Sequence, residues 1–382
     1  LHENALNYLV KAGQQAVAHS AMAEAVALLE KGLGLLIAMP SSREHHKQEL
    51  QLRLALAGAL IGTKGYSSPQ VSETWARAGV LGELIGETSH FIPIAGQWAH
   101  HLVRAERRLG LPFAEQMQQR GKEQQDSVAV LLGRFYEGIS RLSLGQFNAA
   151  DALFEECHEL RDASLRQAVS HILSEDSYSV MLGYSSINLA YLGYLDQART
   201  RANEGVLESR RLRHFYTLGF CLTLKCWTSY IANMMHEVGQ HADEISDLAN
   251  EYGFPLWSAS AVFYQGLSLT AHGQASEGVT LMIRAQDQLS TMGHVLFSPY
   301  QLTCIAEVYG KLGQPAEGLR KLRDAEQLIE TTEERHHEAE VHRLEGDLLR
   351  MMDDQLAAER SYHCALASPT DRVREPTSSV QL

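Results

Sequence analysis

The sequence predicts an all-α fold in which about nine antiparallel helix pairs stack into an α-solenoid. Three observations lead to this prediction. Apolar residues recur at the i, i+3, i+4 and i+7 spacing of one helix face. Turn-marking residues recur at intervals of 34 to 48 residues, as in repeat proteins. No stretch alternates polar and apolar residues for long, so we expect essentially no sheet.

The clearest helix pair begins at Ser298. One face of its first helix carries the apolar residues Leu302, Ile305, Ala306 and Tyr309. Pro315 then opens the second helix, where its missing N–H and fixed φ do no harm. The second helix carries a stripe of small and apolar residues, namely Gly318, Leu322, Ala325 and Ile329. Small residues let a neighbouring helix approach closely, so this pair needs another pair to cover its stripe.

Residues that mark helix ends recur in the same way earlier in the chain. We expect one helix to end at each of Gly145, Gly193, Gly239, Gly273, Gly313 and Asp353. Five residues after most of these marks, a stripe at i, i+4 and i+7 begins, for example Ala198, Ala202 and Gly205, which is typical of the second helix of a tetratricopeptide (TPR) repeat. After Gly239 the same positions hold Glu244, Leu248 and Glu251, two of which are charged. This departure predicts that the second helix of this unit is shifted in register or faces solvent.

The first 125 residues continue the array with weaker marks. Helical residues from Asn4 to Ser20 precede the stripe Ala25, Leu29 and Gly32. Ser41 with Glu44 forms a capping box for the next helix, and Ser68 followed by Pro69 starts another. A third pair covers about Phe91–Arg108 and Pro112–Gln124.

These marks divide the chain into one array, residues 1–367, followed by a tail. The expected pairs cover residues 1–40, 42–88, 90–125, 127–160, 176–212, 214–252, 255–292, 298–332 and 334–367. Residues 161–178 are additional to the repeat length, and we expect them to form either an inserted helix or an elongation of the flanking helices. Residues 368–382 contain two prolines and several Ser and Thr residues without an apolar stripe, which predicts a disordered tail.

Composition excludes several classes of partner. A formal net charge of −13 argues against general nucleic-acid binding, because phosphates require clustered Lys and Arg. No apolar run approaches the length of a transmembrane helix, so we expect no membrane association. Five scattered cysteines favour a reducing cytoplasm. Leu1 enters partway through a helix pair, so we expect the chain to be part of a longer protein.

No residue pattern predicts a catalytic, cofactor-binding or metal site. The best histidine cluster is His336, His337, Glu340 and His342, but His337 and His342 are five residues apart, whereas a zinc helix needs four. His336 with Glu340 supplies only two ligands, and a catalytic zinc needs three from the protein. Residues 58–64 lack the spacing, residue order and strand context of a phosphate loop.

A stack of helix pairs has a concave face that suits peptide or domain binding. First helices usually line that face, which makes Trp257, Tyr264, Gln265, Tyr300 and Gln301 the candidate partner-binding residues. The alternative, which we favour for the aromatic residues, is that they pack in the core.

Residues 12–36, 48–66, 253–257, 306–322 and 334–349 resemble one family. Its members are TPR-like arrays at the C-terminal end of large bacterial signalling proteins. In these, a class III adenylate/guanylate cyclase domain and then a P-loop signal-transducing ATPase precede the array. The resemblance covers about residues 4–366. Related arrays also follow ATPases joined to LuxR-type DNA-binding domains or Ser/Thr kinases.

The resemblance implies a non-catalytic, cytoplasmic regulatory scaffold whose partner is a protein, either its own ATPase and cyclase domains or another chain. It is compatible with self-association. The cyclase carboxylates and the ATPase phosphate loop have no counterpart here, so no functional residue carries over, although the parent protein would be an enzyme. Members usually continue with further helix where residues 368–382 lie. His336 and His337 stand where members often have aromatic residues, which favours packing.

Overall fold

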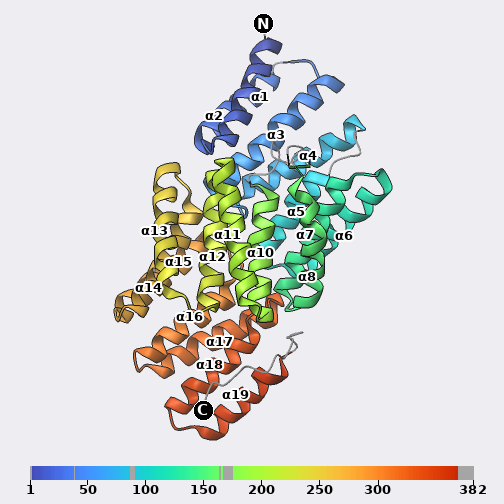
Figure 1. Cartoon of the computed structure of the whole chain (residues 1–382). Helices are drawn as coiled ribbons and strands as arrows, with labels where there is room; N and C mark the ends of the chain where they lie inside the picture. Colours follow the sequence, from blue (N-terminus) through green and yellow to red (C-terminus); the bar gives the residue numbers. More distant parts are fainter. Residues whose placement is uncertain (1, 38, 87–90, 163–164, 167–174, 369–382) are drawn as a thin grey trace.

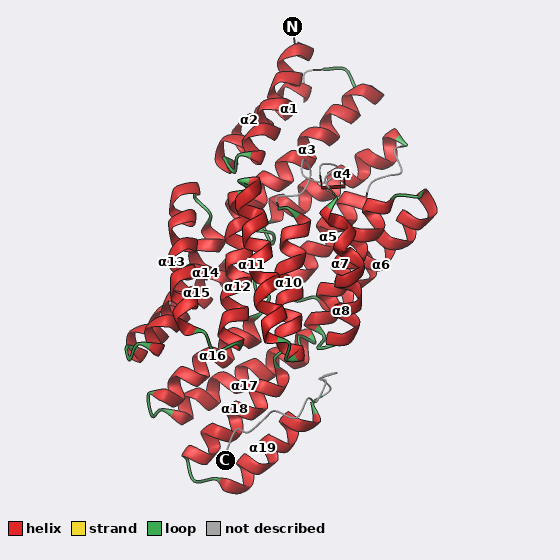
Figure 2. Ribbon diagram, viewed as in Figure 1, coloured by secondary structure: helices red, strands yellow, loops and turns green. Residues whose placement is uncertain are grey.

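The computed structural model describes residues 2–37, 39–86, 91–162, 165–166 and 175–368. Within these ranges the chain forms 18 α-helices and one 3-10 helix, and no strand is present (Figures 1 and 2). The chain is therefore a TPR-like all-α solenoid. Within the same residues, none of the helices combines the length and the apolarity that a bilayer crossing requires.

The helices form antiparallel pairs that we number in chain order. Pairs 1 to 4 are α1 (His2–Ala18) with α2 (Met22–Ile37), α3 (Arg43–Lys64) with α4 (Pro69–Ile85), α5 (Phe91–Val103) with α6 (Arg107–Gln124), and α7 (Ser127–Ser143) with α8 (Phe147–Glu156). The 3-10 helix η1 (Cys157–Arg161) follows pair 4.

Pairs 5 to 9 complete the array. They are α10 (Ser177–Leu192) with α11 (Leu195–Leu212), α12 (Phe215–Ile231) with α13 (Met235–Tyr252), α14 (Pro255–Ala271) with α15 (Ala275–Thr291), α16 (Ser298–Lys311) with α17 (Pro315–Thr332), and α18 (Glu338–Met351) with α19 (Gln355–Ala367). Much of the 161–178 insertion, and the tail from residue 369 on, lie outside the described residues.

The turn inside each pair has a more regular period than the glycines indicate. From pair 2 on, the turn of every pair contains a residue with positive φ, at a spacing of 40 apart from one interval of 48; these residues are Gly65, Ala105, Gly145, Gly193, Asn233, Gly273, Gly313 and Asp353. Asparagine tolerates this left-handed conformation better than most residues, because its short polar side chain can bond locally. The interval of 48 contains the insertion.

The expected turn at Gly239 was wrong. Gly239 lies inside α13, and Asn233, with φ of 56°, marks the turn. The buried stripe of α13 is Val238, Ala242 and Ile245, at the usual i, i+4 and i+7 spacing and in the usual place five residues after the turn. This helix therefore neither slips nor turns its stripe to solvent.

Three helix boundaries in the first half also differ from expectation. The first helix of pair 3 ends at Val103 rather than Arg108, because the chain turns at Ala105, and Pro112 lies inside α6 rather than at its start. The cap of α3 is Ser42, one residue after the expected Ser41, and its side chain accepts a hydrogen bond from the backbone N–H of His45.

The superhelix closes on itself, because each of the first four pairs contacts the pair five positions further along. Val103 ends α5, and its carbonyl oxygen accepts hydrogen bonds from the N–H groups of Val295 and Leu296, which lead into α16, at 2.9 and 3.0 Å. One unit later, the carbonyl of Ser143 accepts from the N–H groups of Arg335 and His336 at 2.8 and 3.2 Å.

The two preceding pairs make related contacts. The Ser20 hydroxyl oxygen accepts a hydrogen bond from the Tyr216 N–H at 3.4 Å, and the Ser67 hydroxyl donates to the Gly293 carbonyl at 2.7 Å. The two bonds join pair 1 to pair 6 and pair 2 to the end of pair 7. As a result, the inner face is a packed interior rather than an open groove.

Candidate functional site

A cavity of about 100 Å³ lies inside the closed superhelix. Most of its wall comes from the first helices of pairs 2 to 8, and the loop before α16 completes it. All four tryptophans of the chain are in this wall, namely Trp75, Trp98, Trp227 and Trp257. Aromatic rings stack within it: Trp98 lies on Tyr136 at a centroid distance of 4.0 Å, and Trp227 lies on Tyr300 at 4.4 Å. The cavity is therefore an aromatic box.

Four of the five candidate partner-binding residues contribute to this wall. Trp257, Tyr264 and Tyr300 are buried, and Gln301 is half-buried beside them. Gln265 lies elsewhere, where its side-chain amide donates a hydrogen bond to the Asp243 carboxylate at 3.0 Å. The structure thus gathers four of the candidates around one cavity and separates the fifth from them.

Several wall residues that sequence reasoning missed occupy equivalent positions in successive units. The ninth residue before the turn lines the cavity in five consecutive pairs; these residues are Gly96, Tyr136, Tyr184, Leu224 and Tyr264. Aligning the units on the true turns, with Ala105 and Asn233 included, would have shown this column. The misplaced turn at Gly239 concealed it.

Charge in the wall is sparse. Among the described residues, Glu175 is the one acidic residue of the wall, and no lysine or arginine contributes to it. Glu175 accepts a hydrogen bond from the Tyr66 hydroxyl at 2.9 Å. Burial lowers the pKa of His294 to about 4, so this side chain is neutral at pH 7. The cavity therefore offers no positive charge to an anion.

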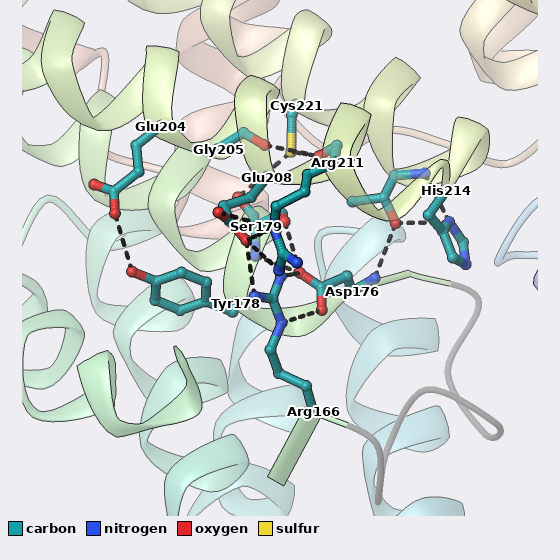
Figure 3. Close-up of polar contacts among 12 residues, drawn as sticks. Arg166, Asp176, Tyr178, Ser179, Glu204, Gly205, Glu208, Arg211, His214 and Cys221 are labelled. Carbon is teal, nitrogen blue, oxygen red and sulfur yellow. Dashed lines mark hydrogen bonds and ion pairs between the residues drawn. The ribbon is translucent and has the colours of Figure 1, made fainter. Parts of the chain in front are cut away.

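A second feature is a buried polar cluster where α10 begins (Figure 3). Arg166 forms a two-pronged ion pair with Asp176, through Nε to Oδ1 at 2.9 Å and Nη2 to Oδ2 at 2.6 Å. Its third nitrogen donates to Glu208 at 2.9 Å, and its guanidinium lies 5.0 Å from the centre of the Tyr178 ring. One arginine from the insertion thus joins α10 to α11.

Asp176 also caps α10, because its carboxylate accepts hydrogen bonds from the Ser179 N–H and hydroxyl groups. Burial alone raises the pKa of Asp176, but the hydrogen bonds and charge of Arg166 outweigh that effect and hold the pKa below its usual value. The backbone N–H of Asp176 donates to the Thr217 hydroxyl, which also contacts His214. The contacts of Arg166 with Glu208 and of Asp176 with Thr217 join neighbouring helices, and those of Asp176 with Ser179 cap α10, so we assign the cluster an anchoring role.

The histidines of residues 336–342, which the sequence does not predict to bind metal, divide into two groups. His336 and His337 are buried, and their rings contact Tyr191, Trp227 and Tyr300, which places them in an aromatic packing layer. The Tyr191 hydroxyl and His337 Nδ1 are 2.9 Å apart.

His342 belongs to another group. Its Nδ1 lies 3.4 Å from Glu326 and 3.9 Å from Glu345, and these three side chains are within metal-ligating distance of one another. Hydrogen bonds to Glu326 and Glu345 raise the pKa of His342 to about 10, so it is protonated at pH 7. A protonated imidazole satisfies both carboxylates as an ion pair, and a metal would first have to displace that proton.

Comparisons with known proteins show the fold. No protein-family model and no curated protein matches the chain. Among solved structures, a Rap protein complexed with competence and sporulation factor aligns with 96% of this chain and 97% of its own, at 11% identity and a TM-score of 0.61. The Rap conjugation gene regulator of plasmid pLS20, in complex with the Phr* peptide, aligns over 95% and 94% respectively, at 10% identity and a TM-score of 0.57. Such low identity supports a shared helical-repeat architecture and nothing finer.

Proposed function

We propose that this chain is a non-catalytic regulatory scaffold that binds a protein or peptide segment at the inner face of its superhelix. The observation that carries the proposal is the aromatic cavity around which the first helices of seven successive pairs converge. Concave inner faces are the usual binding surface of helical-repeat proteins. The two similar solved structures contain a competence and sporulation factor and a Phr* peptide, which supports a peptide or protein as the partner.

The residues that we propose to contact the partner are Trp257, Tyr264, Tyr300 and Gln301 in the wall, together with Gln265, which lies on α14 outside the wall. Aromatic residues dominate binding energy at protein interfaces because they bury much area at little entropic cost. In the closed state these side chains are largely covered, so a partner must either insert a small group into the cavity or separate the contacts between distant pairs.

The resemblance of the sequence to cyclase–ATPase arrays supports a more specific proposal. The chain would be the regulatory segment of a cytoplasmic signalling protein, with its own ATPase and cyclase domains as partners. The alternative parents are an ATP-dependent LuxR-type transcription regulator and a Ser/Thr kinase. Sequencing the gene upstream of Leu1 tests this directly, because a cyclase domain there supports the first parent and a kinase domain there contradicts it.

The binding proposal is tested by selecting random displayed peptides on the purified chain. We expect the selected peptides, once synthesised, to bind wild type roughly tenfold or more tightly than the cavity-filled variant Ala99→Phe. The matched control is Ala27→Phe, which adds the same ring at an exposed position on α2 and should bind as wild type does. Equal binding to all three proteins would refute the inner face as the binding surface.

Two further measurements test the rest of the proposal. The purified chain should neither bind ATP nor form cyclic nucleotide, and either activity would contradict a non-catalytic scaffold. Light scattering over a range of concentrations tests the proposed self-association, for which we expect a mass above that of one chain as concentration rises.

A further inference from the structure

The cavity has a size and composition that narrow the kind of group it can hold. Its volume of about 100 Å³ is on the scale of the dry, apolar cavity of about 150 Å³ that binds benzene in another protein. One aromatic ring or a short branched chain therefore fits, and a larger ligand does not fit without opening the superhelix.

The wall is unsuited to an anion. A buried carboxylate or phosphate requires a positive partner, because desolvating a charge is costly. In the part of the chain that the structure describes, the wall supplies no lysine or arginine, and Glu175 would repel a negative group. His294 is neutral because burial lowers its pKa. An uncharged group avoids both penalties.

Two indole N–H donors in the wall have no partner among the described residues. They are the indole N–H groups of Trp227 and Trp257, which are 2% and 3% exposed. Buried donors are rarely left unpaired in native proteins, and an unpaired one calls for an explanation such as a bound molecule. An oxygen that accepts a hydrogen bond would satisfy an indole N–H.

We propose that this cavity binds an uncharged apolar group, about the size of one aromatic ring, that carries a hydrogen-bond-accepting oxygen. The inference rests on the proposed function, because it concerns the same inner face and names the group that this face receives. Two sources have this chemistry. One is a free small molecule, and the other is an aromatic or aliphatic side chain of a peptide with its adjacent backbone carbonyl.

An occupant would also strengthen the closure of the superhelix. The wall includes Val103 on α5 and Leu296 in the loop before α16, and the Leu296 N–H donates to the Val103 carbonyl. A group in the cavity contacts both sides of this junction. Binding therefore stabilises the contact between pairs 3 and 8, which is a means by which a ligand could signal to neighbouring domains.

The tryptophans provide a direct assay. With ¹⁵N in the indole nitrogens, the protein gives four N–H signals, all from the cavity wall. We would titrate it with benzyl alcohol, which is neutral and carries an accepting oxygen, and with benzoate, an anion of similar size. We expect benzyl alcohol to shift the Trp227 or Trp257 signal saturably, and benzoate to bind at least roughly tenfold more weakly. Slower hydrogen exchange at the Val295 and Leu296 amides should accompany binding.

Variants test the location. Ala99→Phe places a ring in the cavity wall and should abolish the benzyl alcohol shift, whereas the exposed Ala27→Phe should leave it unchanged. If Ala99→Phe loses helical circular dichroism, Thr223→Leu at another half-buried wall position replaces it. Binding of benzoate as tight as that of benzyl alcohol, or shifts that persist in the filled variant, would overturn the inference.

A peptide arm separates the two sources. In the selected peptides, each aromatic or aliphatic residue is replaced in turn with glycine. If one of these side chains enters the cavity, its replacement should weaken binding to wild type but leave binding to Ala99→Phe unchanged. Benzyl alcohol binding without any selectable peptide supports a free ligand, and it contradicts the peptide scaffold while leaving this inference intact. If benzyl alcohol does not bind and no peptide residue is sensitive, the cavity is not a binding site.

Discussion

The close crossing of α14 and α15 gives a prediction whose sign can be worked out from the structure. Gly266 is buried on α14, and a Cβ atom built there would lie 2.6 Å from the Gly278 carbonyl oxygen and 2.9 Å from Met282 Cγ. Ordinary contact begins at 3.4 Å, so the Gly266→Ala variant must separate the two helices by several tenths of an ångström. The closest atom belongs to the backbone, so no side-chain rotation relieves the contact.

Two opposing effects set the magnitude. Alanine is favoured over glycine inside a helix by about 1 kcal/mol. Overpacking a well-packed contact costs about 1–3 kcal/mol. Because the closest clash is with the backbone, the overpacking cost lies in the upper part of that range, at about 2–3 kcal/mol. After the helix gain is subtracted, Gly266→Ala should lower the free energy of unfolding by about 1–2 kcal/mol. Gly34→Ala on α2 is the control, because Gly34 is exposed with no atom within 4 Å of the new Cβ, and it should be stabilising.

Urea unfolding followed by circular dichroism measures both variants. Because solenoids unfold by units, hydrogen exchange should locate the loss of protection in α14 and α15. A Gly266→Ala variant as stable as wild type would refute the reasoning. So would a Gly34→Ala variant destabilised to the same extent, since the cost would then be unrelated to the crossing.

Three further predictions concern the anchoring cluster, the His342 ion pair and the C-terminal stripe. Arg166→Met should lower the free energy of unfolding by about 3–5 kcal/mol because it leaves a buried carboxylate unpaired, and adding Asp176→Asn should recover part of that loss in a double-mutant cycle. The pKa of His342 is raised from 6.5 to about 10, so the stabilisation by its positive charge is fully present below pH 6.5 and is lost as the pH rises through about 10. Between pH 7 and 10 the urea midpoint should therefore fall more for wild type than for His342→Gln. Ala325→Trp, at a fully buried position, should cost about 1–3 kcal/mol or more, and unchanged thermal stability would show that Ala325 faces water.

The all-helical repeat fold could be predicted from the sequence because helix spacing and small-residue stripes are local signals. The turn positions could be predicted where glycine marks them, and at Asp353 from its place in the repeat. At Asn233 and Ala105 the left-handed conformation is adopted by residues other than glycine, so the sequence does not indicate a turn there. Gly239 indicates a turn but lies inside α13. Placing the turn of pair 6 at Asn233 instead of Gly239 gives the 40-residue spacing and the buried stripe Val238, Ala242 and Ile245.

The site could be predicted only in part. Four of the five first-helix candidates lie around one cavity, and their role in binding a partner stays a prediction. The cavity itself depends on how far the superhelix turns per unit, which no local pattern encodes. Arg166 pairs with Asp176 across an insertion that has no counterpart in the other units, so repetition gave no guide to that contact.

The superhelix closes through contacts that recur with the repeat, rather than through one isolated contact. Val103 and Ser143 are equivalent carbonyls one unit apart, and their donors at 295–296 and 335–336 are displaced by the same 40 residues. The contact is therefore made twice with the same geometry, and the insertion between pairs 4 and 5 lengthens the chain without changing that register. The two junctions have no pair in common, but pair 3 packs on pair 4 and pair 8 packs on pair 9. Opening one junction therefore weakens its neighbour, and a group that holds the cavity wall together at pair 3 also favours the junction at pair 4. A regulatory signal carried by this chain would travel along these junctions, on the inner side of the superhelix where the aromatic cavity lies.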